Sequence, residues 1–296
     1  MPPALFGGTR ILAAGLALLG YLAFRGERLH MQRRDFYWMG LAGICLFVGG
    51  NGLITLAAKT LPSGLATVLV SMSPLFLAIL ETVWPWGERL TLRGWLGLFA
   101  GIVGLLVVLQ PRLMHLDGLT GNNGPLYALL SAFTWAIGSF VVRHHPHHGS
   151  HLTAAAYQML IGGTALTLVG LAAGETALVS PGCFTPTAIF SFFYLLAVGS
   201  LIGFICYNWL LKRVSAVLAG TYAYVNPLVA IVVGWWLGNE ELSAWIFGGM
   251  FIIVTGVALV RFGGVRHATM IDKPVSKGEA LEQDTEETWE CEGVSG

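Results

Sequence analysis

The sequence predicts an all-α polytopic membrane protein made of two inverted repeats, and three observations carry this prediction. First, hydrophobic residues make up 55% of the chain and charged residues only 11%, whereas a soluble domain has about 25% charged residues. Second, the chain contains nine apolar stretches of about the 20 residues that a helix needs to cross a bilayer. Third, its two halves resemble each other and are interrupted by proline at matching places.

The nine apolar stretches are expected to be helices, since a chain segment inside lipid must satisfy its own backbone hydrogen bonds. We place them near residues 5–24, 36–57, 62–84, 92–110, 124–142, 152–173, 187–211, 216–237 and 243–262.

The loops between these stretches predict the orientation in the membrane, because Lys and Arg are retained on the cytoplasmic side. One side has only Lys59 and Arg112. The other side has Arg25, Arg28, Arg33, Arg34, Arg89, Arg93, Arg143, Lys212, Arg213, Arg261 and Arg266. We therefore expect a cytoplasmic C-terminus and, with nine spans, an N-terminus outside.

The two halves align when the chain is shifted against itself. A shift of 153 residues aligns Lys59 with Lys212 and Pro74 with Pro227. Shifts of 152 and 148 residues pair Glu88 with Glu240, Gly97 with Gly249, Leu12 with Leu160 and Gly15 with Gly163. The first and sixth spans correspond at a distance of five helices, and an odd number of crossings reverses direction. The halves are therefore predicted to be inverted repeats.

The fifth span, residues 124–142, precedes the other four of its repeat but has no counterpart before Leu5. We therefore expect two five-helix repeats with nine of ten helices present and the first helix missing. The expected domains are residues 1–111 for the first repeat and 112–265 for the second. Residues 266–296 are expected to form a disordered acidic cytoplasmic tail, since half of the acidic residues lie between Asp272 and Glu292.

The two prolines at matching places point to a solute site. Proline has no backbone N–H, so Pro74 and Pro227 leave the carbonyls of Val70 and Ala223 without their helical partners. In a membrane, such groups must be satisfied by protein or face a watery cavity. Paired interruptions in corresponding spans predict a transporter's binding site near the midplane.

Six short motifs, in this order and spacing, resemble the EamA-type branch of the drug/metabolite transporter (DMT) superfamily. They are Thr9-Arg10-Ile11-Leu12-Ala13-Ala14-Gly15, Gly49-Gly50-Asn51-Gly52, Leu61-Pro62-Ser63-Gly64-Leu65-Ala66, Gly87-Glu88-Arg89-Leu90-Thr91, Trp135-Ala136-Ile137-Gly138-Ser139 and Tyr222-Ala223-Tyr224-Val225-Asn226-Pro227. The resemblance implies ten helices in two inverted repeats, both termini in the cytoplasm, and a central cavity that moves small polar metabolites, often outward. It also implies a location in the cell (inner) membrane.

Ten residues near the two interruptions and in these motifs are predicted to bind substrate: Asn51, Ser71, Ser73, Pro74, Trp135, Ser139, Tyr222, Tyr224, Asn226 and Pro227. Polar groups at that depth are costly unless they are paired, which favours a functional role. The alternative is a helix kink in which the hydroxyls bond to their own backbone. For Asn51 the alternative is an interhelical hydrogen bond, and for Trp135 it is packing.

Two charged side chains lie inside or near spans. Glu81 is expected at the cytoplasmic interface beside Trp84, although a proton or cation site is the competing interpretation. Arg10 is expected to extend to the outer interface rather than to bind an anion.

Two further patterns have structural interpretations. Gly94, Gly97, Gly101 and Gly104 form a stripe on one helix, which predicts close helix packing and allows a homodimer. The histidines of residues 144–151 are expected in a cytoplasmic loop rather than at a metal site. The four cysteines show no metal-ligand spacing. No metal and no cofactor are predicted.

The leading hypothesis is a secondary transporter, exporting small organic metabolites such as amino acids by alternating access. A membrane-embedded enzyme is disfavoured because neither a GxSxG motif nor paired carboxylates occur within the spans. A non-transporting fragment or scaffold is the third hypothesis. The expected partners are a solute and the lipid bilayer, and nucleic acid is not expected.

Overall fold

The computed structural model describes residues 2–27, 29–61, 63–85, 87–113, 123–145, 150–180, 182, 184–226, 229, 244–263 and 265–267. Among these residues, five helical segments are long and apolar enough to cross a membrane. They are Pro3–Phe24, Arg33–Ala57, Gly124–His144, His151–Ala172 and Pro186–Arg213. The predicted all-helical membrane fold is confirmed, whereas Pro227 and the tail beyond residue 267 lie outside the described residues.

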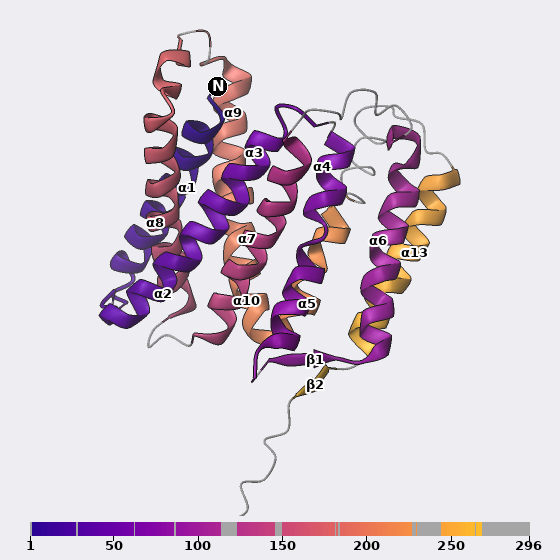
Figure 1. Ribbon diagram of the computed structural model, residues 1–296. Coiled ribbons are helices and arrows are strands. Elements are labelled where there is room, and N and C mark those ends of the chain that lie inside the picture. Colours follow the sequence, from indigo (N-terminus) through magenta and orange to yellow (C-terminus); the bar gives the residue numbers. More distant parts are fainter. Residues whose placement is uncertain are drawn as a thin grey trace, which may run out of the picture.

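Helices also occupy the remaining predicted spans, as far as the described residues extend. The third span contains α4 (Ser63–Val70) and α5 (Ser73–Val83), and the fourth is α6 (Leu92–Leu113). The eighth begins with α11 (Ala216–Gly220), and the ninth is α13 (Ala244–Gly263). In the middle of the molecule, α7 (Gly124–His144) contacts the second span on one side and α4 and α5 on the other (Figure 1).

Two long spans contain a π-helical stretch. The first runs from α2 (Arg33–Gly43) through η1 (Ile44–Gly52) into α3 (Leu53–Ala57). The second runs from α9 (Pro186–Tyr194) through η4 (Leu195–Ile202) into α10 (Gly203–Arg213). Each widened turn shifts the direction of the side chains that follow, and such turns are frequent at functional sites.

At one edge of the molecule, α1 (Pro3–Phe24) packs antiparallel against α8 (His151–Ala172) (Figure 1). Glycine permits the close approach. A Cβ on Gly163 would lie 2.5 Å from the backbone nitrogen of Leu12, and a Cβ on Gly15 would lie 2.9 Å from that of Leu160. Small residues at helix crossings are a common device in membranes, because lipid provides no hydrophobic drive for association.

A short 3₁₀-helix, η2 (Glu175–Leu178), follows α8. A carboxylate oxygen of Glu175 accepts a hydrogen bond from the backbone N–H of Leu5 at 2.9 Å. This contact pairs one of the free N–H groups in the first turn of α1 and places a negative charge at the positive end of its dipole.

At the opposite edge, α6 packs against α13 (Figure 1). A Cβ on Gly97 would lie 2.6 Å from the carbonyl oxygen of Gly256, and one on Gly104 would lie 2.8 Å from the nitrogen of Ile253. Gly101 faces the ring of Tyr224. The predicted glycine stripe therefore packs within the chain, and the homodimer stays a prediction.

A serine hydroxyl connects the two helices that proline interrupts. Between α4 and α5, Ser73 Oγ donates to the carbonyl oxygen of Val70 at 2.5 Å. Ser71 Oγ lies 2.8 Å from the carbonyl oxygen of Thr67 and 3.1 Å from that of Ala223. The freed carbonyl of Val70 thus accepts from Ser73, and that of Ala223 shares the single hydroxyl proton of Ser71 with Thr67. The contact between Ser71 and Ala223 joins the two halves of the chain.

A cluster of charges, which we call the end cluster, joins several elements at the end of the molecule that was predicted to be cytoplasmic. It consists of Glu81, Glu88, Arg143 and His144. Arg143 Nη2 lies 2.6 Å from Glu88, whose other oxygen accepts from the N–H of Ala216 at 3.0 Å. Arg143 Nη1 donates to the carbonyl of Leu211 at 2.6 Å. The cluster therefore ties α7 to the C-terminal end of α10 and the start of α11.

Glu81 is fully buried in this cluster. Its expected position at the cytoplasmic interface stays a prediction. Its carboxylate lies 2.9 Å from His144 Nε2 and accepts from the backbone N–H of Glu88 at 3.0 Å. Beside it, strand β1 (Glu88–Leu90) pairs antiparallel with β2 (Val265–His267). Arg266 and His267, which were assigned to the tail, thus belong to a strand.

Candidate functional site

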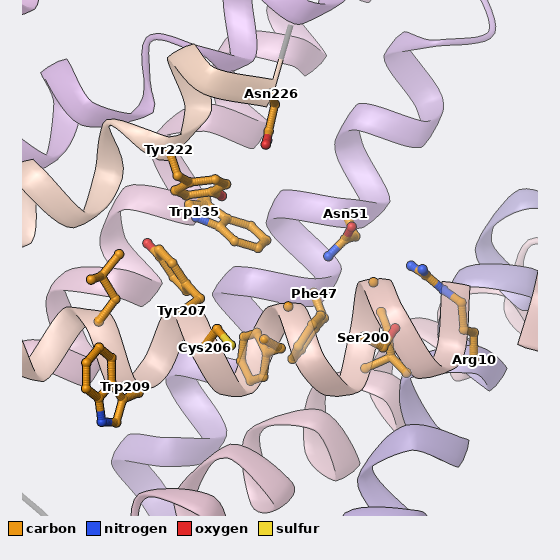
Figure 2. Close-up of a pocket in the computed structure, with 15 residues that line it drawn as sticks. Arg10, Phe47, Asn51, Trp135, Ser200, Cys206, Tyr207, Trp209, Tyr222 and Asn226 are labelled. Carbon is orange, nitrogen blue, oxygen red and sulfur yellow. The ribbon is translucent and has the colours of Figure 1, made fainter. Parts of the chain in front are cut away.

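A cavity of about 530 Å³ lies between α1, η1, α7, η4, α10 and the helical residues 222–226 (Figure 2). This volume is within the range of about 300–1,000 Å³ that is typical of small-molecule sites. Both halves of the chain contribute to its walls. The π-helix η1 places Phe47 and Asn51 on the cavity, and η4 places Gly199 and Ser200 there.

Six aromatic residues form a large part of the cavity wall. The ring centroids of Trp135 and Tyr207 are 5.7 Å apart, and those of Tyr207 and Tyr222 are 5.1 Å apart. Phe47 and Phe204 pack against each other at 4.8 Å. Such a wall suits the apolar body of an organic solute.

The aromatic wall also has polar positions. The hydroxyls of Ser139 and Tyr207 are 2.6 Å apart, which fixes the tyrosine ring against α7. Trp135 Nε1 is buried and makes no hydrogen bond of good geometry among the described residues, although the Tyr207 hydroxyl lies near it. A buried N–H without a partner costs about 1–3 kcal/mol, so Trp135 is poised to donate to a ligand.

Arg10 is the one charged residue among the described residues that line the cavity. Its expected extension to the outer interface is not what the structure shows, since the side chain points into the cavity (Figure 2). Nη1 lies 3.4 Å from the carbonyl of Leu195, and Nε is buried with no partner among the described residues. A cation thus lies against the cavity without an acidic partner in the part of the chain that the structure describes.

The structure brings together four of the ten predicted binding residues. Asn51, Trp135, Tyr222 and Asn226 line the cavity. Asn51 Nδ2 lies 3.5 Å from the carbonyl of Leu46, at the limit of a hydrogen bond, so its amide is available to a ligand. Asn226 is exposed at the other end of the cavity, with its side chain directed inward (Figure 2).

Five others do not line this cavity. Ser71 and Ser73 bond to backbone carbonyls, and Pro74 packs against Gly220. Ser139 lies behind the cavity wall, bonded to Tyr207 and to the carbonyl of Trp135, and Tyr224 is fully buried against α6. The tenth, Pro227, lies outside the described residues. Substrate contact by any of the ten stays a prediction.

Sequence reasoning missed Tyr207, Ser200 and Phe204, although a signal for two of them was present. The same shift of 153 residues that aligns the prolines moves Phe47 to Ser200 and Asn51 to Phe204. All four of these residues line the cavity. The alignment of the two halves therefore identifies the segment around Phe204 as the counterpart of the segment around Asn51.

Comparison with known proteins identifies the family to which this fold and cavity belong. The model of the EamA-like transporter family matches residues 1–110 and 122–262. The chain is 35% identical over 272 residues to the uncharacterized inner membrane transporter YedA of Escherichia coli (strain K12), covering 88% of this chain and 82% of that protein. It is 28% identical over 265 residues to the uncharacterized transporter YvbV of Bacillus subtilis (strain 168), with coverage of 88% and 82%.

A more distant relative is the probable amino-acid metabolite efflux pump of Escherichia coli (strain K12), 25% identical over 276 residues, with coverage of 89% and 87%. A solved crystal structure has the same fold, with a TM-score of 0.71 at 21% identity over 88% of both chains. The three named relatives are transporters by name, and the matching family is a transporter family rather than one of enzymes. The chain belongs to the EamA-like transporter family of the DMT superfamily.

Proposed function

We propose that this protein is a secondary transporter that exports small organic metabolites, such as amino acids or related solutes, by alternating access around the cavity. The observation that carries the proposal is the cavity itself, which has a volume suited to such a solute and walls from both halves of the chain. The distant relative named a probable amino-acid metabolite efflux pump supports the solute class and the direction.

Contacts between corresponding helices support two inverted repeats as the moving parts. The first predicted span, α1, packs antiparallel against its counterpart α8, and α6 packs antiparallel against its counterpart α13. The two proline-broken helices meet between Ser71 and Ala223. The π-helices η1 and η4 fall in the corresponding second and seventh spans. Inverted repeats that meet around a site are the arrangement that allows one to rock against the other.

The end cluster supports an orientation with this end in the cytoplasm. It lies among the basic residues that predict the cytoplasmic side, and β2 brings the chain to the same end after the last helix. We therefore propose a cytoplasmic C-terminus and a location in the inner membrane, in line with the inner membrane relative.

An export assay on matched tryptophan variants tests the proposed site. Trp135→Ala removes a large part of the cavity wall, and we expect it to reduce export at least tenfold, a loss of about 1.4 kcal/mol. The control is Trp245→Ala, because Trp245 is 57% exposed on α13 and does not line the cavity. The measurement is efflux of a panel of amino acids from preloaded cells, corrected for the amount of folded protein in the membrane.

A second pair of variants separates the cavity from the proline-broken helix beside it. Asn226→Ala alters a residue that lines the cavity, whereas Tyr224→Phe removes a hydroxyl that lies 3.4 Å from the carbonyl of Leu98, away from the cavity. Export should fall in the first variant and persist in the second. Unchanged export in both Trp135→Ala and Asn226→Ala would show that the solute passes elsewhere.

A further inference from the structure

Arg10 has no charge partner among the described residues around it. It is the one charged residue of α1, and neither of the ion pairs found among the described residues includes it. Its Nε is buried without a partner, and its Nη1 has only the long contact to Leu195. An arginine within a span is costly and is normally paired or directed to the interface. The guanidinium is therefore placed to bind an anion that enters the cavity.

Other groups of the cavity also lack an acceptor. Trp135 Nε1 is a second buried donor without a hydrogen bond of good geometry among the described residues, and Asn51 presents its amide on the same cavity (Figure 2). No acidic residue lines the cavity within the part of the chain that the structure describes. Two buried donors, Arg10 Nε and Trp135 Nε1, thus lie on a cavity whose described lining carries one positive charge and no negative charge.

We propose that Arg10 binds the carboxylate of the transported solute, whose apolar body then lies against the rings of Trp135, Tyr207 and Tyr222. The proposal rests on the proposed transport function and names the substrate class of the same cavity. A guanidinium binds a carboxylate through two parallel N–H donors, which fixes the orientation of the ligand as well as its charge.

The single charge favours a monocarboxylate over a phosphate ester. One guanidinium balances one negative charge in a cavity with low polarity, whereas a dianionic phosphate would keep an uncompensated charge away from water. The aromatic rings add a surface that attracts an apolar group and can also face an ammonium group through cation–π contact. Both aromatic acids and amino acids in their zwitterionic form fit these requirements.

The test compares a carboxylate with its amide of the same shape. Purified protein in detergent is titrated with 3-phenylpropionate and with 3-phenylpropionamide, and binding is measured by calorimetry. We expect the wild-type protein to bind the acid at least tenfold more tightly than the amide. In Arg10→Gln this ratio should fall to about one while the affinity for the amide is kept, and Arg10→Lys, which keeps the charge, should retain part of the preference.

Arg33→Gln is the matched control, because Arg33 is exposed at the start of α2 and does not line the cavity. It should leave the ratio unchanged. A general loss of folding would lower both affinities together, and Arg10→Lys then gives the deciding ratio. Equal binding of acid and amide by wild-type protein, or a ratio unchanged in both Arg10 variants, would overturn the proposal.

The binding assay and the export assay separate two kinds of failure. If Trp135→Ala abolishes export but Arg10→Gln leaves the acid-to-amide ratio intact, transport stands and carboxylate recognition by Arg10 is wrong. If the ratio depends on Arg10 but cells export none of the amino acids tested above the level of cells without the protein, the binding site stands and the proposed export is wrong. A wild-type protein that binds neither probe also overturns the proposal.

Discussion

Replacing Gly256 by alanine should weaken the packing of α13 on α6 and lower the stability of the protein by about 1–3 kcal/mol, the usual cost of overpacking. A Cβ at this position would lie 2.7 Å from the carbonyl oxygen of Gly97 and 2.8 Å from the nitrogen of Gly101. Both are backbone atoms, so no side-chain rotation can make room. The two helices would have to move apart along this contact.

Gly248 on the same helix provides the matched control. A Cβ there would meet nothing within 4 Å, and alanine favours a helix over glycine by about 1 kcal/mol. We expect Gly248→Ala to be neutral or stabilising in thermal unfolding followed by size-exclusion chromatography in detergent. Equal midpoints for both variants would mean that the contact between α6 and α13 is not close in solution.

The positions of the helices could be predicted because a span needs a long apolar segment and the polar connections are short. The π-helical stretches could not be predicted from these segments. Hydropathy is the same whether the backbone bonds connect residues four or five apart, and η1 and η4 lie within apolar runs. The pairing of β1 with β2 was also missed, because each strand has only three residues and brings together distant parts of the chain.

The sequence predicted how deep in the membrane the candidate site residues lie, but not the direction in which their side chains point. Tyr222 and Tyr224 lie at the same depth, yet residues two apart on a helix face away from each other, so only one can face a cavity. The structure places Tyr222 on the cavity and Tyr224 against Gly101 of α6. The sequence predicted that the carbonyls of Val70 and Ala223 lack their helical partners, but it did not show that the hydroxyls of Ser73 and Ser71 would contact them.

The direction of the Arg10 side chain could not be predicted from the sequence either. Its distance from the end of α1 was compatible with extension to the interface, and the outcome depended on the direction in which the side chain leaves the helix. That direction is set by the packing of α1 on α8, where Gly8 and Gly15 face the partner helix. Only the packed structure shows that Arg10 then points to η4 and the cavity.

Removing the carboxylate of Glu88 should have the largest effect on stability, because it breaks the end cluster. Glu88→Ala leaves Arg143 without its ion pair at 2.6 Å and the N–H of Ala216 without its acceptor. Breaking a buried pair costs about 3–5 kcal/mol, and we expect a value near the lower end because the side chain of Arg143 is 22% exposed. Unfolding in mixed detergent micelles with increasing dodecyl sulfate measures the change.

A double-mutant cycle shows how much of this loss belongs to the pair. Glu88→Ala and Arg143→Ala should be non-additive, with a coupling energy of about 1–3 kcal/mol, because each removes the same contact. Glu27→Ala with Arg33→Ala is the control cycle, since no contact between these two side chains is found, and its coupling should be near zero. Additive losses for Glu88 and Arg143 would mean that the stability comes from the separate bonds to Ala216 and Leu211 rather than from the ion pair.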